Sequence, residues 1–254
     1  AHLRARGPPM TDPAPAVDAL LFDMFGTVVD WRGGFLRDGP AIGAAAGVDV
    51  DWGSFADAWR EEYRPALDRV RSGEVPWRNL DSLQAESLEA LIDRFGLEGL
   101  SEADVDRLHH IWHRLDPWPD SIPGLRRLKP HHLIAPLSNG HVRLLTNVAK
   151  RAGIPWDLIL SAELSRHYKP DEQAYLTALE LLDLEPSSVM MVAAHEYDLK
   201  ASREFGLRTA YIHRPYEWGP EAAASVERPD EGAYDVVVDS LVELADALGA
   251  PPIA

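Results

Sequence analysis

Short apolar runs alternate with amphipathic helical segments from Pro117 to the C-terminus, and this alternation limits the folds open to the chain more than any other feature. The spacing predicts strands at 133–137, 158–160, 189–193, 209–212 and 236–238, and helices that end near 152, 182, 205 and 248. Strands that alternate with helices form a parallel sheet covered by helices on both faces. We therefore expect an α/β fold in this part of the chain.

One more strand precedes a long interruption of that pattern. Residues 17–23 form an apolar run that ends at Asp23 and leads into a turn, as a buried parallel strand does. From Trp31 to Trp118 the apolar residues recur only at helical spacing. The sequence therefore predicts a Rossmann-like parallel sheet flanked by helices, formed by residues 17–30 and 118–254, with an all-helical cap domain inserted at 31–117 and a tail at 1–16.

The composition narrows the choice of partners. With 254 residues, 46% of them hydrophobic, the chain can bury one large core or a core with a smaller second domain. Its 25 Lys and Arg residues against 41 Asp and Glu residues give a net charge of −16. A polyanion is repelled by this charge, so nucleic acid and anionic membrane surfaces are poor candidates for partners. The absence of cysteine excludes disulfides, thiolate zinc sites and cysteine nucleophiles.

The apolar runs are too short to span a membrane, and the first residues lack the apolar stretch of a secretory signal. We therefore expect a soluble, cytoplasmic protein. Because the chain begins with Ala1, we interpret Met10 as a natural start and Ala1 to Pro9 as added residues or a disordered extension.

Polar residues follow several of the predicted strands, at the edge where an open parallel sheet binds ligands. A single Asp or a Ser-Asn-Gly segment at such a place is more often part of a turn than a catalytic group. An ordered set along one sheet is more specific, and it points to an active site. The members of the set are Asp23, Thr27, Ser138, Asn139, Lys169, His195 and Asp198.

Four segments that contain these residues resemble the four motifs of the haloacid dehalogenase superfamily. Residues 23–30 (DMFGTVVD) resemble the first motif, 138–140 (SNG) the second, 168–171 (YKPD) the third and 192–199 (VAAHEYDL) the fourth. The resemblance covers nearly the whole chain from about Val17, and the helical insert lies at the position of the family's cap. It implies the α/β core and inserted cap of that superfamily.

The superfamily consists mostly of phosphatases, and this chain differs from them at two places. In the phosphatases of this superfamily the first motif reads Asp-x-Asp, and its second Asp protonates the leaving oxygen. Phe25 stands at the position of that second Asp here. A halide leaves without a proton, so it needs no such acid. Ala193 and Ala194 stand where the fourth motif usually supplies a carboxylate for magnesium. Both differences favour the type II 2-haloacid dehalogenases and predict a site with no metal and no cofactor.

The resemblance implies a role for each polar residue in the dehalogenation of a small anionic 2-haloalkanoate. Asp23 attacks C2 and displaces the halide, and water then hydrolyses the aspartyl ester to release the 2-hydroxy acid. Lys169 keeps Asp23 ionised, and Thr27 orients it. The remaining roles are substrate carboxylate binding by Ser138 and the adjoining Asn139, positioning of the polar cluster by Tyr175, and orientation of Lys169 or activation of water by Asp198.

Two assignments depart from the family's pattern. His195 stands where the best-known members carry Asn, and it is either a water-directing base, part of the halide pocket, or a hydrogen-bonded structural histidine. The family's halide-binding arginine has no clear match. Arg32 is favoured because it follows the first strand closely, and the competing residues are Arg37, Arg60 and Arg64.

Phe25 and Trp31 are candidate walls of an apolar pocket that would desolvate the nucleophile. Packing between the core and the cap is the alternative for both residues. For Trp59, Trp77 and Trp112 we expect that packing role, because aromatic residues at helical spacing usually belong to a core.

Three other functions stay open. The chain could be a magnesium-dependent phosphatase of atypical motif, a hydrolase of another activated 2-substituted carboxylic acid such as a small cyclic imino acid, or a non-catalytic protein that binds a metabolite or partner through its cap. The sequence also leaves open the preferred halogen, fluoride included, the length and stereochemistry of the substrate, and the formation of a homodimer.

Overall fold

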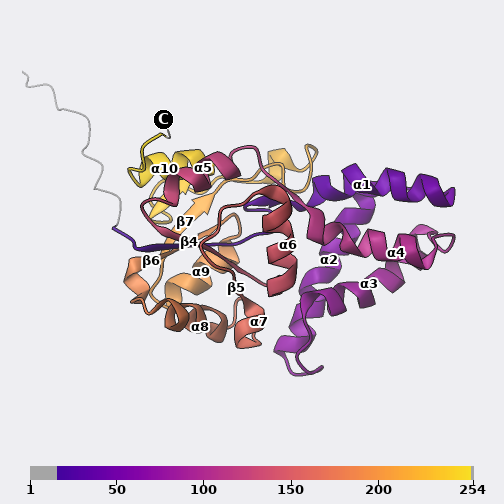
Figure 1. Cartoon of the computed structure of the whole chain (residues 1–254), viewed down its shortest axis with the longest axis horizontal. Coiled ribbons are helices and arrows are strands. Elements are labelled where there is room, and N and C mark those ends of the chain that lie inside the picture. The colour runs from indigo at the N-terminus through magenta and orange to yellow at the C-terminus, as the bar shows by residue number, and fades with distance from the viewer. Residues whose placement is uncertain (1–15, 253–254) are drawn as a thin grey trace, which may run out of the picture.

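The computed structural model describes residues 16–252, so the prediction for residues 1–9 lies outside the described residues. A six-stranded parallel sheet in the order β5-β4-β1-β6-β7-β8 forms the centre of the molecule (Figure 1). Its strands are β1 (Ala19–Phe22), β4 (Leu133–Ser138), β5 (Leu160–Ser161), β6 (Val189–Ala193), β7 (Arg208–Ile212) and β8 (Val236–Val238). The parallel α/β sheet that the alternating pattern predicts is thus confirmed.

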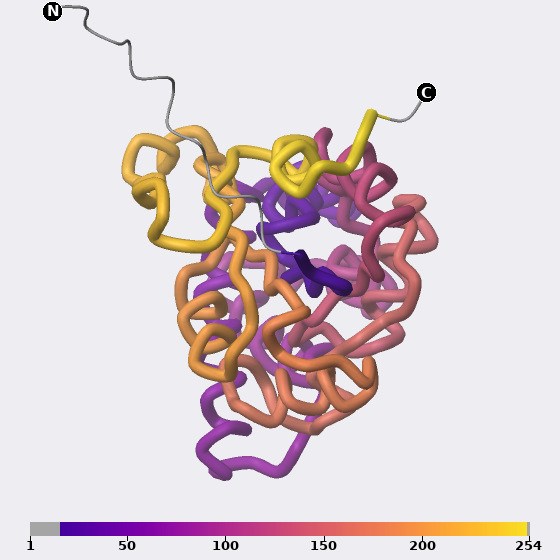
Figure 2. The backbone as a smooth tube through the Cα atoms, turned by 90° about the vertical axis from the view of Figure 1, so that its left-hand side faces the viewer, coloured from indigo at the N-terminus to yellow at the C-terminus, as the bar shows by residue number. Residues whose placement is uncertain are grey.

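Helices cover both faces of this sheet because its strands are apolar on both sides. Leu20 and Phe22 of β1 belong to one hydrophobic cluster, whereas Ala19 and Leu21 belong to the other. Figure 2 shows the start of β1 near the middle of the molecule, between helical segments above and below it. The covering helices are α5 (Ser121–Leu128), α6 (Val142–Ala152) and α10 (Leu241–Ala247) on the first face, and α8 (Glu172–Leu182) and α9 (Glu196–Glu204) on the second.

The strand predicted at 158–160 begins later than expected. Only Leu160 and Ser161 pair with the neighbouring strand, opposite Leu137 and Ser138 of β4, because β5 lies at the edge of the sheet and has a partner on one side only. Three short helical turns complete this part of the chain, namely α7 (Ala162–Ser165), η2 (Pro186–Ser188) and η3 (Ala223–Ser225).

The long insert is helical except at its two ends. It contains α1 (Trp31–Ala46), α2 (Trp52–Arg71), α3 (Leu80–Phe95), α4 (Glu102–His109) and the 3-10 helix η1 (His110–Arg114), which lie to one side of the sheet in Figure 1. The expectation of helices alone is wrong at the boundaries, where β2 (Val29–Asp30) pairs antiparallel with β3 (Asp116–Pro117). The chain thus crosses between the two regions on two adjacent strands, and the domain boundaries at 31 and 117 stay a prediction.

N-capping side chains fix the first residue of several inserted helices. Asp30, Asn79 and Ser101 each accept a hydrogen bond from a backbone N–H of the first turn of α1, α3 and α4, respectively. Gly96, with φ +67°, ends α3 in the left-handed conformation that glycine adopts without strain.

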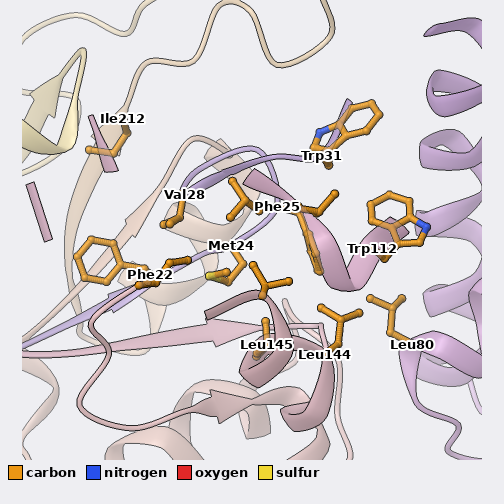
Figure 3. Packing of buried hydrophobic residues seen from close by; sticks show 14 of the residues in the cluster. Phe22, Met24, Phe25, Val28, Trp31, Leu80, Trp112, Leu144, Leu145 and Ile212 are labelled. Atoms are coloured by element: carbon orange, nitrogen blue, oxygen red, sulfur yellow. The ribbon is translucent and has the colours of Figure 1, made fainter. Parts of the chain in front are cut away.

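The insert and the sheet share one apolar core. Phe22, Phe25, Trp31 and Trp112 belong to the same buried cluster, and Figure 3 shows it running from the sheet to the inserted helices. The Phe25 ring meets Trp112 edge-on at 5.8 Å between centroids. Trp59 is buried in this cluster as well, so the predicted packing role of Trp59 and Trp112 is confirmed. Within residues 16–252, no helix combines the length and the hydropathy that crossing a bilayer requires.

Candidate active site

The loop after β1 places a carboxylate at the end of the central strand. The backbone N–H of Asp23 donates to Val192 of β6 at 2.9 Å, and Thr27 donates its hydroxyl proton to Asp23 Oδ2 at 3.0 Å. Gly26 has φ +87°, and a Cβ there would lie 2.2 Å from the Glu217 carboxylate. The turn therefore requires glycine both for its conformation and for the close approach of Glu217.

A buried ammonium group connects Asp23 to a second carboxylate. Lys169 Nζ donates to Asp23 Oδ1 at 3.1 Å and also to Asp198 Oδ2. The Tyr175 hydroxyl donates to the other oxygen of Asp198 at 2.6 Å. Asn139 holds the loop that carries the lysine, because its Oδ1 accepts the backbone N–H of Lys169 at 2.7 Å. The structure thus brings together one residue from each of the four motifs, namely Asp23, Asn139, Lys169 and Asp198. Tyr175 of α8 joins them.

The surroundings give the two carboxylates different acidities. Burial by itself would raise the pKa of Asp23, but the Lys169 ammonium and the His195 ring outweigh it and hold that pKa well below its ordinary value. Burial raises the pKa of Asp198, against the attraction of Lys169. Asp23 is therefore the carboxylate that stays ionised and available as a nucleophile.

His195 lies between two carboxylates, one of which sequence reasoning missed. Its Nδ1 is 2.9 Å from Asp23 Oδ2, and its Nε2 is 3.1 Å from both oxygens of Glu217. Burial lowers the pKa of His195, but the charge of Glu217 and the contact with Asp23 raise it to about 10. The ring is therefore an imidazolium in the resting site. Glu217 also accepts the Trp31 indole N–H at 3.0 Å.

No local pattern identifies Glu217, because it lies in the loop after β7, and only the tertiary fold brings this loop to the end of β1. Its approach to Gly26 and its contact with His195 are both long-range. The sequence contained one weak signal, an acidic residue a few positions beyond a predicted strand end.

A cavity of about 240 Å³ opens above this cluster, between helix α2 and the loops at the ends of the strands. The Arg60 guanidinium is buried and stacks over the Tyr63 ring at 4.3 Å and the Trp31 ring at 5.6 Å, and its Nη1 has no hydrogen-bond partner among the described residues. A buried cation of this kind is a receptor for an anion. The cavity is lined by Arg60, Glu61, Tyr63, Arg64, Leu67, Asp68, Arg71, Asn139, Lys169, His195, Tyr197 and Trp218.

Of the eleven predicted site residues, Asn139, Lys169 and His195 line the cavity. Asp23, Thr27, Tyr175 and Asp198 belong to the hydrogen-bonded cluster that includes Lys169 and His195. The other four, Arg32, Phe25, Trp31 and Ser138, lie elsewhere. Arg32 is held by Asp57 of α2, with Nε 2.8 Å from Oδ1, because the phase of α1 turns its side chain toward α2. Phe25 packs in the core, and Trp31 lies behind the lining, where it donates to Glu217 and packs under the Arg60 guanidinium. Ser138 is buried and its Oγ accepts the N–H of the second residue after it, at 3.1 Å. Arg32 is therefore not part of the lining, whereas the competing candidates Arg60 and Arg64 both are.

Phosphatases of this fold use magnesium, for which the carboxylates near Asp23 are the candidate ligands. Two carboxylates accompany Asp23, and both are already engaged, Asp198 by Lys169 and Tyr175, and Glu217 by His195. Magnesium prefers octahedral oxygen ligands that are free to bind it. The residues present therefore do not fit a magnesium site.

The site thus consists of an ionised aspartate at the end of a central strand, a lysine, and a histidine–glutamate pair next to a small cavity. Such a carboxylate is chemically able to act as a nucleophile, as in one class of hydrolases. The comparison with known families agrees with this class. A family model described as haloacid dehalogenase-like hydrolase matches residues 17–206, and the chain belongs to this family.

Several known proteins resemble the chain closely. The structure of the L-2-haloacid dehalogenase PA0810 has a TM-score of 0.87 and 46% identity, covering 93% of this chain and 100% of that one. A defluorinating L-2-haloacid dehalogenase has a TM-score of 0.85 and 42% identity, covering 92% and 96%. The (S)-2-haloacid dehalogenase 4A of Burkholderia cepacia is 29% identical over 80% of this chain and 87% of its own length.

The chain is similar to phosphatases as well. The N-acetylmuramic acid 6-phosphate phosphatase of Pseudomonas aeruginosa is 26% identical over 91% of this chain and 94% of its own length. Similarity alone therefore does not distinguish dehalogenation from phosphate-ester hydrolysis. The chemistry of the site residues has to distinguish them.

Proposed function

We propose that the protein is a hydrolytic 2-haloacid dehalogenase that converts a small 2-haloalkanoate and water into the 2-hydroxy acid, halide and a proton, without a metal. The observation that carries the proposal is the buried, ionised Asp23, held by Lys169 and His195 beneath a cavity that also contains the buried cation of Arg60. The similarity to the L-2-haloacid dehalogenases supports it.

In the first step, an Asp23 oxygen donates an electron pair to C2 of the substrate, and the carbon–halogen bond breaks with its electrons going to the halide. The product is an ester between Asp23 and the 2-carbon, formed with inversion at that carbon. Lys169 and Thr27 hold the carboxylate in place for this attack. Burial of the site removes water from the nucleophile and strengthens each of these interactions.

Two anions have to be bound during this step, the substrate carboxylate and the departing halide. We assign the halide to Arg60, whose buried Nη1 needs a partner. Asn139 lines the cavity and, together with the backbone N–H groups near Ser138, is assigned to the carboxylate. Phe25, which stands where the phosphatases carry a proton donor, is compatible with a halide because this leaving group takes no proton.

In the second step, water attacks the carbonyl carbon of the Asp23 ester, and the alcohol oxygen of the hydroxy acid leaves with the bond electrons. One proton of the water passes through the His195–Glu217 pair to solvent, the other goes to the departing alcohol oxygen, and Asp23 is left as a carboxylate again. Esterification neutralises Asp23, which removes one of the two charges that raise the His195 pKa, so the ring gives up its own proton more readily after the first step than before it. This assignment makes Glu217 the residue that orients His195.

The cavity limits the substrate to small acids. Its volume of about 240 Å³ lies below the roughly 300–1,000 Å³ of pockets for drug-sized ligands. A substrate with a two- or three-carbon chain fits this size. The defluorinating relative gives a reason to include fluoride among the leaving groups that are tested.

The direct test is the release of halide and hydroxy acid from chloroacetate, fluoroacetate and each enantiomer of 2-chloropropionate, in the presence of EDTA. We expect EDTA-resistant release of both products in equal amounts, and its loss in Asp23→Asn. A single turnover in oxygen-18 water should label Asp23 itself, measured by mass spectrometry of the peptide. Label found only in the hydroxy acid would contradict the ester intermediate.

The second candidate is a phosphatase of the same family, which the similarity to N-acetylmuramic acid 6-phosphate phosphatase favours. It predicts phosphate release from a generic phosphate ester that requires magnesium and stops in EDTA. If this activity appears and halide release does not, the interpretation of Phe25 and of the engaged carboxylates is wrong.

A further inference from the structure

A second cluster of potential ligand groups lies apart from the catalytic cavity. Asp81 belongs to the first turn of α3, His113 to η1, and His141 precedes α6, so the cluster joins the inserted helices to the sheet region. One ligand atom from each residue lies within 4.8 Å of the others. None of the three lines the catalytic cavity.

The distances in the cluster are those of groups that can share one ion. His113 Nε2 is 2.9 Å from Asp81 Oδ2, and His141 Nε2 is 3.4 Å from the same oxygen. Ligands at about 2.0–2.1 Å from a tetrahedral metal ion are separated by similar distances. The three side chains thus need little movement to bind an ion between them.

The hydrogen bonds of the protein leave one of these side chains unsatisfied. The side chain of His141 is only 7% exposed, and its Nδ1 has no hydrogen-bond partner among the described residues. Its Nε2 points to Asp81 across the 3.4 Å contact. The 3.4 Å contact is the single polar contact of His141 Nε2 with a side chain among the described residues, so this nitrogen is available to an ion, whereas the unpartnered Nδ1 is the other ring nitrogen.

A neighbouring amide supports the orientation of the second histidine. The side chain of Asn147 on α6 lies with its Nδ2 2.9 Å from His113 Nδ1, which directs the other ring nitrogen, Nε2, toward Asp81. When a metal ion binds Nε2, the proton of the ring is on Nδ1, so the Asn147 amide would present Oδ1 rather than Nδ2 to accept it. The backbone carbonyl of Asp81 in turn bonds the His109 ring at 3.1 Å.

We propose that Asp81, His113 and His141 form a zinc site at the junction between the helical insert and the sheet region, with water as the fourth ligand. Two imidazoles, one carboxylate and an open position are a donor set that zinc accepts. The site lies outside the reaction cavity, and the proposal is independent of the dehalogenase reaction.

The electrostatics of the cluster agree with this assignment. Zinc binds neutral imidazole and ionised carboxylate. Burial lowers the pKa of His141, which keeps its ring neutral at neutral pH. Burial by itself would raise the pKa of Asp81, but the surrounding histidines, His113 foremost, lower it. The side chain of Asp81 is 22% exposed and provides the path from solvent.

The expected effect of the ion is to tie α3 and η1 to the start of α6, one residue after the Ser138–Gly140 loop of the catalytic site. A ligand that binds only the folded chain raises its melting temperature in proportion to the logarithm of its concentration. Zinc should therefore stabilise the folded protein without being needed for turnover.

The test is titration of the EDTA-treated full-length chain with zinc, followed by calorimetry and by the melting temperature. We expect one ion per chain, and with cobalt in place of zinc the visible absorption of a tetrahedral site. His141→Gln and Asp81→Asn should each weaken binding at least tenfold. The matched control is His110→Gln, which removes an exposed neighbouring histidine and should leave binding unchanged.

Two further variants show whether a loss of binding comes from misfolding and whether zinc binds at the catalytic site instead. Asn147→Ala keeps all three ligands and should weaken binding about 10- to 100-fold. Asp23→Asn should bind zinc as the unaltered chain does, which separates this site from the catalytic carboxylates. The proposal is overturned if the unaltered chain takes up no stoichiometric zinc, or if binding survives His141→Gln and Asp81→Asn while Asp23→Asn abolishes it. In either case the cluster is a hydrogen-bonded contact only.

Discussion

Replacing Glu217 with Gln tests the electrostatics of the active site with little change of shape. The amide keeps an acceptor for the Trp31 indole and a partner for His195, but it removes the charge. In the unaltered chain, the pKa of His195 is about 10, against an ordinary value of 6.5. A tenfold change in acidity corresponds to about 1.4 kcal/mol, so the surroundings favour the imidazolium by about 5 kcal/mol in total.

The charge of Glu217 is large enough to account for this preference. At 3.1 Å, a unit charge interacts with another by about 5 kcal/mol when the effective dielectric constant is about 20. Among the causes that raise the His195 pKa, Glu217 is the largest, whereas burial acts in the opposite direction. Removing an interaction of this size should lower the pKa of His195 from about 10 to about 7, and to no more than about 8.

The measurement is an NMR titration of the His195 ring in both proteins, with the melting temperature recorded over the same pH range. Because the folded-state pKa is raised, the stabilisation by His195 is complete below pH 6.5 and is lost as the pH rises to about 10. In Glu217→Gln this loss should be complete by about pH 8. The matched control is Glu61→Gln, which removes one negative charge from the exposed rim of the cavity.

A His195 pKa that stays near 10 in Glu217→Gln refutes the reasoning, because the second carboxylate would then not be its cause. An equal fall in Glu61→Gln would refute it as well, since the effect would then come from net charge rather than from direct contact. Either result would also remove the support for the His195–Glu217 pair as the group that accepts the water proton.

Three further variants test the remaining contacts. Lys169→Met removes the cation shared by two buried carboxylates and should lower the free energy of unfolding by about 3–5 kcal/mol in urea. Lys200→Met, at an exposed ion pair, should have far less effect on the same measurement. Arg60→Leu should lower kcat/KM for chloroacetate about 10- to 150-fold, and an equal loss in Arg32→Leu would contradict the assignment of the anion site. Gly26→Ala should be strongly destabilising and inactive, and a normal melting temperature would show that the turn tolerates a side chain there.

Much of the site could be predicted because its residues follow strands of one parallel sheet. The carboxyl ends of such strands meet at one edge, so Asp23, Lys169 and Asp198 were expected together although they are far apart in the sequence. Tyr175 was expected near them from the resemblance to the family, and its hydroxyl donates to Asp198.

Residues whose position depends on helix phase or on loop path could not be predicted in the same way. Arg32 and Arg60 are both arginines on inserted helices, and only the packing of α1 against α2 turns one toward Asp57 and the other toward the cavity. Glu217 lies in a loop without a repeating pattern, so nothing in its neighbours along the chain indicates its contact with His195.

The order of apolar runs, turns and helix caps along the chain is local information, and it suffices for the parallel sheet, the helical insert and the set of residues that end the strands. Contacts between segments that are distant in sequence are not determined by this local information, because they depend on how whole helices, strands and loops pack against one another. The pairing of His195 with Glu217, the burial of Arg60 and the meeting of Asp81 with His113 and His141 therefore emerge only once the helices and loops are assembled around the sheet.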